Sequence, residues 1–187
     1  GEINPYFTGL GPQIESYKTL IGVGKEIGEE VVQAANESRE VPEDNLPIKT
    51  RSKKTEFDLR YKLDNEWIQL GFFFTYGKEY MAPEFGGVSP QIDVETSILT
   101  LGDELGWVGF PGEFFDDFQI DLRDRSPIPN TFFVGYCNGY VSYFPTIEAA
   151  SEGGYGAHYG TIVEVGAGER LIDEAIVDLY EMSGRFR

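Results

Sequence analysis

Cysteine and histidine are almost absent from this chain of 187 residues, which holds one of each, Cys137 and His158. A single cysteine excludes an intrachain disulfide. With a single histidine as well, the chain cannot build an HExxH site, a four-cysteine site, a site of two cysteines and two histidines, or a three-histidine zinc site of its own. A zinc site made by this chain alone would need carboxylates and phenols.

Positive charge and long apolar runs are also scarce. Fifteen Lys and Arg residues stand against 32 Asp and Glu residues, which gives a net charge of -17. A field of that sign repels phosphate backbones and anionic lipid headgroups, so nucleic acid is not an expected partner. No apolar run approaches about 18 residues and no signal peptide opens the chain, so no transmembrane segment is predicted. The compartment stays open, because the acidity suits the cytoplasm and the exterior alike.

The overall composition is that of a globular domain. Hydrophobic residues make up 41% of the chain and charged residues 25%, as in folded proteins and unlike disordered or fibrous ones. At this length a chain buries roughly 70% of its unfolded surface, so it needs no disulfide or metal to stay folded. We expect a single domain or domain fragment over residues 1–187. Because the first residue is glycine, we also expect a processed or excised piece of a longer chain.

The hydrophobic period changes once in the N-terminal half. Apolar residues recur every three or four positions from 14 to about 39, which predicts an amphipathic helix. Residues 40–54 mix prolines, acids and a basic cluster, and are predicted to form an exposed connection. A period of two then predicts two strands, over 55–63 and 67–76, that pair as a hairpin.

The C-terminal half alternates strands and helices. Two strands over 92–101 and 104–110 are predicted to pair, and a helix follows over 114–125. The scarcity of charge in 131–137 favours a central strand. The last third predicts a short helix, a strand and an amphipathic helix, over 147–152, 161–165 and 168–182. We therefore expect an α/β fold, or α+β as the alternative, built as a layered mixed β-sheet with flanking helices.

Glu113 differs from the other acids in its position. It follows a predicted strand and a Pro-Gly turn and opens a predicted helix, at the carboxyl end of a strand where α/β sheets present functional side chains. The plain alternative is an acid that complements the helix dipole, and that alternative explains Asp116 and Asp117 best.

Phenol side chains crowd into 24 residues of the same half of the chain. Packing is the default role of any one tyrosine, but a group of phenols on loops after a strand exceeds what a core requires. Glycines beside them let the backbone approach a ligand closely. The group consists of Tyr136, Tyr140, Tyr143, Tyr155 and Tyr159.

Two other features have simpler structural explanations. Gly22, Gly24 and Gly28 have the spacing GxGxxxG inside a helix that follows a loop, which does not fit a dinucleotide site and favours close packing of the helix on a sheet. Cys137 lies in an apolar segment with no neighbouring base to activate it, so we expect a buried structural thiol.

Five segments carry a pattern that belongs to a known family: GEINP, FPGEFF, SPIPNTFFVGYCNGYVSYFPT, EAASEGGYG and GAGERLIDEAIVDL. Together they resemble the C-terminal half of the catalytic domain in the neutral/alkaline non-lysosomal ceramidase family and its bacterial and archaeal relatives. The resemblance covers most of the chain and is weak between about residues 40 and 91. It implies that the chain is half of a larger catalytic domain.

The resemblance also implies an activity and a site. The family hydrolyses the amide bond of N-acyl lipids and binds zinc through two histidines, one glutamate and one tyrosine. In the matching motifs, Glu113 corresponds to the glutamate ligand and Tyr143 to the tyrosine ligand. Tyr155 corresponds to a second site tyrosine that bonds the reacting group. Asn4 stands where ceramidases carry a serine, so it is expected to orient the substrate or the attacking water, and ceramide itself is in doubt as the substrate.

The two histidine ligands are expected upstream of Gly1, in an N-terminal portion of the same domain. The leading hypothesis is thus a partial zinc amidohydrolase that is inactive without that portion and that uses metal-activated water on an N-acyl lipid or another amide. Glu113, Tyr143 and Tyr155 are expected to converge on one cavity, with the GEINP segment beside residues 139–143. A noncatalytic ligand-binding or structural subunit is the alternative. A carboxylate-only glycosidase ranks last, because it requires two carboxyl groups roughly 5 to 10 Å apart.

Overall fold

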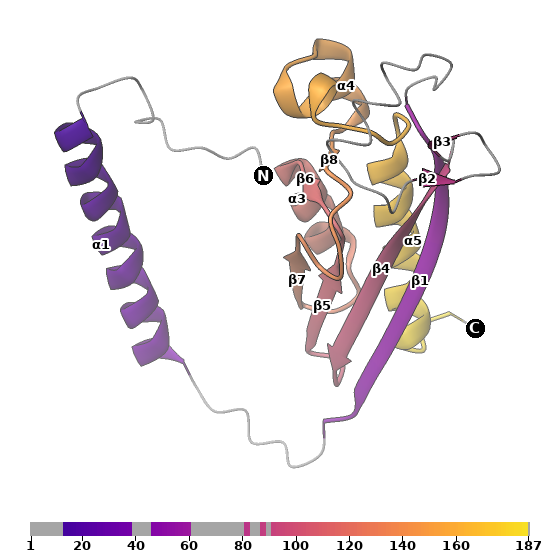
Figure 1. The fold of residues 1–187 in the computed structure, drawn as a ribbon. Coiled ribbons are helices and arrows are strands. Elements are labelled where there is room, and N and C mark those ends of the chain that lie inside the picture. The colour runs from indigo at the N-terminus through magenta and orange to yellow at the C-terminus, as the bar shows by residue number, and fades with distance from the viewer. Residues whose placement is uncertain (1–12, 39–45, 61–80, 83–86, 89–90, 187) are drawn as a thin grey trace. The chain divides into compact units, whose positions relative to one another are not determined.

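Figure 1 shows the computed structural model, which describes residues 13–38, 46–60, 81–82, 87–88 and 91–186. The chain divides into two compact units, one formed by residues 3–46 and the other by residues 1–2 and 47–187. Within the described residues, no helix has both the length and the apolar composition that a membrane crossing requires.

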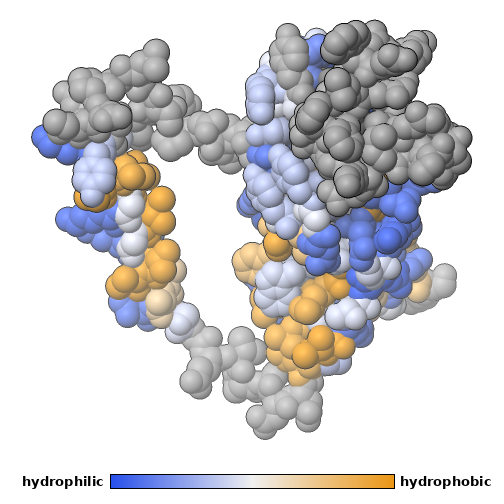
Figure 2. Space-filling model, in the orientation of Figure 1, coloured by the Kyte–Doolittle hydropathy of each residue, from blue (hydrophilic) through white to orange (hydrophobic). Residues whose placement is uncertain are grey.

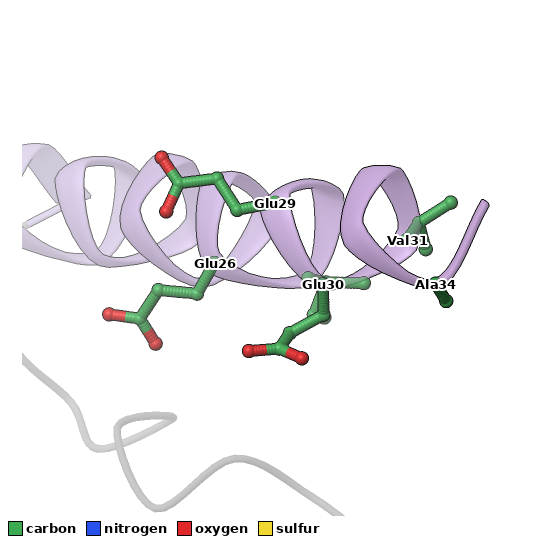
Figure 3. A pocket seen from close by; sticks show the side chains of 6 residues that line it. Glu26, Glu29, Glu30, Val31 and Ala34 are labelled. Carbon is green, nitrogen blue, oxygen red and sulfur yellow. The ribbon is translucent and has the colours of Figure 1, made fainter. Parts of the chain in front are cut away.

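The first unit contains α1 (Gln13–Glu37), which confirms the amphipathic helix expected over 14–39. Its apolar side chains, such as Leu20 and Ile27, are 66% and 60% exposed. In Figure 3, Val31 and Ala34 lie on the C-terminal side of Glu26, Glu29 and Glu30 along this helix. The expected packing of the helix glycines on a sheet stays a prediction, because α1 forms a unit of its own.

A four-stranded mixed sheet organises the second unit. Its strands are β1 (Ile48–Asp58), β4 (Gln91–Leu101), β5 (Leu105–Gly109) and β7 (Asn130–Val134), in the order β1-β4-β5-β7. β4 is antiparallel to β1 and β5, whereas β5 and β7 are parallel. With the helices that pack on this sheet, the chain has the expected α/β fold.

Two helices, α3 (Asp116–Arg125) and α5 (Ala167–Met182), pack on one face of the sheet (Figure 1). Alternate residues of β4 are buried beneath them, including Ile92, Val94 and Ile98. The opposite face carries exposed apolar side chains, which gather over the lower part of the sheet in Figure 2. They include Ile48, Leu99, Phe132 and Val134.

Short elements complete the second unit. β2 (Met81–Ala82) pairs with β3 (Gly87–Val88), and β6 (Glu113–Phe114) pairs in parallel with β8 (Tyr143–Phe144). After β8 come α4 (Ile147–Glu152) and a π-helical turn, η3 (Tyr155–Tyr159).

Four sequence predictions of elements need correction. The basic cluster 49–54 belongs to β1 and not to a connection, because alternate residues of β1 face the acidic side of α5. β7 is the end strand of the described sheet, not a central strand, and its residues alternate between exposed and half-buried. Residues 161–165 form only an isolated bridge, between Val163 and Leu59. The helix expected from 114 begins at Asp116, since Glu113 and Phe114 form β6. The strand predicted over 67–76 lies outside the described residues.

The core lies between the sheet and the two helices. Among the described residues, its first member along the chain is Phe57 and its last is Met182. Phe114 of β6 stacks on Phe144 of β8 with ring centroids 4.2 Å apart, and Phe110 contacts Phe114 at 4.7 Å. Both phenylalanines of this stacked pair are almost fully buried. The residues directly before them, Glu113 and Tyr143, are therefore anchored by the core.

Candidate functional site

The site begins where two neighbouring parallel strands end. Glu113 follows β5 by four residues, and Tyr136 follows β7 by two. The backbone N–H of Phe110, just after β5, donates to the carbonyl oxygen of Val134 at the end of β7, 2.9 Å away. Because the carboxyl ends of parallel strands meet at one edge of a sheet, the segments after β5 and β7 leave the sheet together.

Glu113 and Tyr143 are brought side by side by the pairing of β6 with β8. Their Cα atoms are partners in the parallel register, and the N–H of Glu113 donates to the carbonyl oxygen of Ser142 at 2.8 Å. Gly112 allows this approach, because a Cβ there would lie 2.6 Å from the same carbonyl oxygen. The pair expected from the motifs is thus adjacent in the structure.

The carboxylate of Glu113 is surrounded by phenols. The hydroxyl of Tyr140 donates to Oε1 of Glu113 at 2.7 Å, and the phenols of Tyr143 and Tyr136 lie near enough to lower the pKa of this carboxylate. Glu113 is only 9% exposed. Burial raises the pKa of Glu113, but the three phenols outweigh burial and leave its pKa below the ordinary value. The carboxylate is therefore ionised at neutral pH.

The phenols respond in the opposite direction. The hydrogen bond to Glu113 is the main cause that raises the pKa of Tyr143 to about 12, with burial adding to it. Burial, followed by the hydrogen bond to Glu113, raises the pKa of Tyr136 and of Tyr140. All three hydroxyls therefore hold their protons at neutral pH, and that of Tyr140 donates its proton to Glu113.

An unusual backbone places two of these tyrosines. Tyr136, Asn138 and Ser142 have positive φ angles of 55°, 59° and 72°, a region that L-residues other than glycine adopt at a cost. Backbone hydrogen bonds fix this segment against the one after β5: Cys137 N–H donates to Phe110 O at 2.9 Å, and Tyr136 N–H to Gly112 O at 3.2 Å. The strained loop is thus held to the segment that carries Glu113.

Two glycines hold the ring of Tyr143. A Cβ at Gly156 would lie 2.9 Å from Cδ1 of this ring, and a Cβ at Gly160 would lie 2.6 Å from Cδ2. The N–H of Tyr143 donates to the carbonyl oxygen of Gly160 at 3.0 Å, and the Ser142 hydroxyl hydrogen-bonds the same oxygen. The turn η3 and the residue after it thus form a cradle that only residues without side chains permit.

Tyr155 lies beside the same ring. Its own ring meets that of Tyr143 edge to face, with centroids 5.7 Å apart, and it is 72% exposed. The structure thus brings Tyr155 to Tyr143 and leaves it accessible to a ligand. Asn4 lies outside the described residues, as does the whole GEINP segment.

Among the described residues, His, Cys, Asp and Glu side chains form no group of three or more that could hold a metal ion. In the same part of the chain, no Lys, Arg or His side chain forms an ion pair with Glu113. A buried, ionised carboxylate beside a phenol offers oxygen ligands to a metal ion whose remaining ligands come from elsewhere.

Two contributors to this site were not assigned from the sequence. Tyr136 and Tyr140 belong to the crowd of tyrosines, but no pattern assigned their hydroxyls to Glu113.

Cys137 was expected as a buried thiol in the strand. It is a half-buried free thiol in the loop after β7, and its Sγ would be 2.4 Å from a Cβ at Gly109.

Comparisons with known proteins find similar solved structures. No family model and no curated protein matches the chain. A neutral ceramidase from Pseudomonas aeruginosa is similar at 22% identity and a TM-score of 0.42, over 50% of this chain and 16% of that one. A ceramidase complexed with C2 is similar at 22% identity and a TM-score of 0.40, over 46% of this chain and 14% of that one. Both of these structures are of ceramidases, and this chain spans only a small part of their length.

Proposed function

We propose that this chain is part of a zinc-dependent hydrolase that cleaves an amide bond, as the resemblance to ceramidases implies. In this proposal it acts only with a portion that supplies two histidines. The observation that carries the proposal is the pairing of Glu113, buried and ionised, with Tyr143 in β6 and β8. These are the two residues that the family motifs assign to the metal.

Glu113 and Tyr143 would hold the zinc ion through their oxygens. When bound, zinc polarises a carbonyl and lowers the pKa of water near it. The lowered pKa of Glu113 keeps an anionic ligand ready at neutral pH. The glycine cradle fixes the Tyr143 ring, so that its hydroxyl stays beside this carboxylate.

Tyr155 and Asn4 would act on the substrate. The exposed phenol of Tyr155 can donate a hydrogen bond to the reacting amide next to Tyr143. Asn4 offers an amide donor and acceptor but no nucleophile, so the attack is by water and no acyl-enzyme forms on it. The substrate class is an N-acyl lipid or another amide. In a reconstituted full-length enzyme, Asn4→Ala should reduce turnover and leave metal binding in place.

Zinc titration of the isolated chain tests this proposal directly. We expect weak binding, because the chain offers two of the four ligands a zinc site takes. Glu113→Gln should abolish this binding and Tyr143→Phe should weaken it. Tyr180→Phe is the matched control, since Tyr180 stacks on Phe186 and belongs to α5.

The opposite results would separate the candidates. Tight stoichiometric binding by the isolated chain would rule out the half-site. If Glu113→Gln binds zinc as the unaltered chain does, Glu113 is not a ligand. The noncatalytic binding or structural subunit is then the better explanation. An upstream sequence with two histidines at metal-ligand spacing would support the enzyme.

A further inference from the structure

The hydroxyl of Tyr140 contacts Glu113 although the ring of Tyr140 lies outside the core. The ring is 46% exposed and stacks on the ring of Tyr136, with centroids 5.8 Å apart and planes 5° apart. Tyr136 is itself 59% exposed. Packing of the ring therefore does not explain a tyrosine at this position, whereas the 2.7 Å hydrogen bond to Oε1 of Glu113 does.

The backbone around Tyr140 is built to deliver this hydroxyl. Val141 N–H donates to the carbonyl oxygen of Pro111 at 2.5 Å, which fixes the residue after Tyr140 to the segment before Glu113. The amide of Asn138 donates to the hydroxyl of Ser97 in β4 at 2.8 Å. These contacts maintain a positive φ at Asn138 and Ser142, two residues to either side of Tyr140. Backbone strain persists where the surroundings over-determine it, and it clusters at functional sites.

We propose that Tyr140 is a positioning residue, whose hydroxyl orients the Glu113 carboxylate for metal binding. This inference rests on the proposed function, because it takes Glu113 as a zinc ligand. A carboxylate that rotates freely loses rotational entropy when it binds a metal. A carboxylate held by a hydrogen bond at Oε1 is already aligned and loses less. Partners of this kind behind metal ligands typically change metal affinity 10- to 100-fold when they are removed.

The test is Tyr140→Phe, which removes the hydroxyl and keeps the ring on Tyr136. The chain carries ¹³C in its glutamate carboxyl carbons, and the signal of Glu113 is assigned by its loss in Glu113→Gln. Zinc ion is added while this signal is followed by NMR. We expect Tyr140→Phe to move the Glu113 signal before any zinc is added and to weaken zinc binding about tenfold or more. Tyr180→Phe should change neither quantity. Because Tyr140→Phe removes a hydrogen bond to a buried carboxylate, its urea unfolding midpoint should fall, and zinc is added only under conditions in which this variant is folded.

Each outcome bears on one of the two proposals. If Tyr140→Phe binds zinc as Tyr180→Phe does while Glu113→Gln abolishes binding, the positioning role is wrong and the proposed function stands. If Glu113→Gln binds zinc unchanged, the proposed function fails, and with it the metal-related role of Tyr140. A shifted Glu113 signal without any loss of zinc affinity also overturns the positioning role.

Discussion

At Gly160 the lack of a side chain leaves room for the ring of Tyr143. The backbone there has a φ of -89°, which any residue adopts, so replacement by alanine tests space alone. A Cβ would lie 2.6 Å from the ring, and we expect Gly160→Ala to lower the free energy of unfolding by about 1–3 kcal/mol. Urea denaturation measures this. Gly28→Ala in α1 is the control, because a Cβ there meets no described atom within 4 Å. An unchanged stability in Gly160→Ala would contradict the close packing of Gly160 against the Tyr143 ring.

Glu113 is expected to make stability depend on pH at the acid end. Its folded-state pKa lies below the ordinary value of 4.5, so the ionised group contributes stability above that value, and the contribution is lost as the pH falls through the folded-state pKa. The unaltered chain should therefore lose more stability than Glu113→Gln between about pH 7 and about pH 3. Urea unfolding of both proteins at each pH measures the difference. Parallel pH profiles would show that the phenols do not stabilise the carboxylate.

Tyr143 makes the corresponding prediction at the alkaline end. Its pKa is raised to about 12 from an ordinary 10.0, so its contribution to stability is complete below about pH 10 and is lost as the pH rises toward 12. Spectrophotometric titration at 295 nm should show one phenol fewer titrating late in Tyr143→Phe. If the number of late-titrating phenols is the same in that variant as in the unaltered chain, the assignment to Tyr143 is wrong.

The sequence motifs indicated three residues of the candidate site but none of its hydrogen bonds. Glu113, Tyr143 and Tyr155 follow from short motifs, and the first two pair in adjacent strands. The contact of Tyr140 with Glu113 depends on positive φ angles at neighbouring residues that are not glycine. Such angles are exceptions to residue preference, so a reading of preferences cannot anticipate them.

At the scale of elements, ion pairs join β1 to α5. Arg51 pairs with Asp178 at 2.5 Å and with Glu181 at 2.6 Å, and Asp178 is buried. We expect Arg51→Met to cost about 1–3 kcal/mol of unfolding free energy, because it leaves a buried carboxylate without its charged partner. Lys54→Met is the control on the other face of the same strand. Equal stability of the two variants, measured by urea denaturation, would mean that the pairs contribute nothing.

Elements with clear hydrophobic periodicity were predicted well, whereas elements that depend on distant partners were not. α1, β4, β5 and α5 show regular apolar spacing and were anticipated closely. The basic residues of β1 resembled a solvated connection, because their partners in α5 lie more than 120 residues further along the chain. β7 was expected at the centre of the sheet because it lacks charge, yet Phe132 and Val134 are exposed on the sheet face opposite α3 and α5.

For the molecule as a whole, the excess of acids limits stability. At a net charge of -17 the compact state repels itself. Raising the salt concentration from about 0.01 M to about 0.1 M shortens the Debye length from about 30 Å to about 10 Å, so the free energy of unfolding should rise. The pairs of Arg51 are partly exposed, and screening should therefore narrow the stability difference between the unaltered chain and Arg51→Met over the same range. Urea unfolding in sodium chloride measures both quantities. A fall in the stability of the unaltered chain would show that its specific ion pairs outweigh the repulsion among its acids.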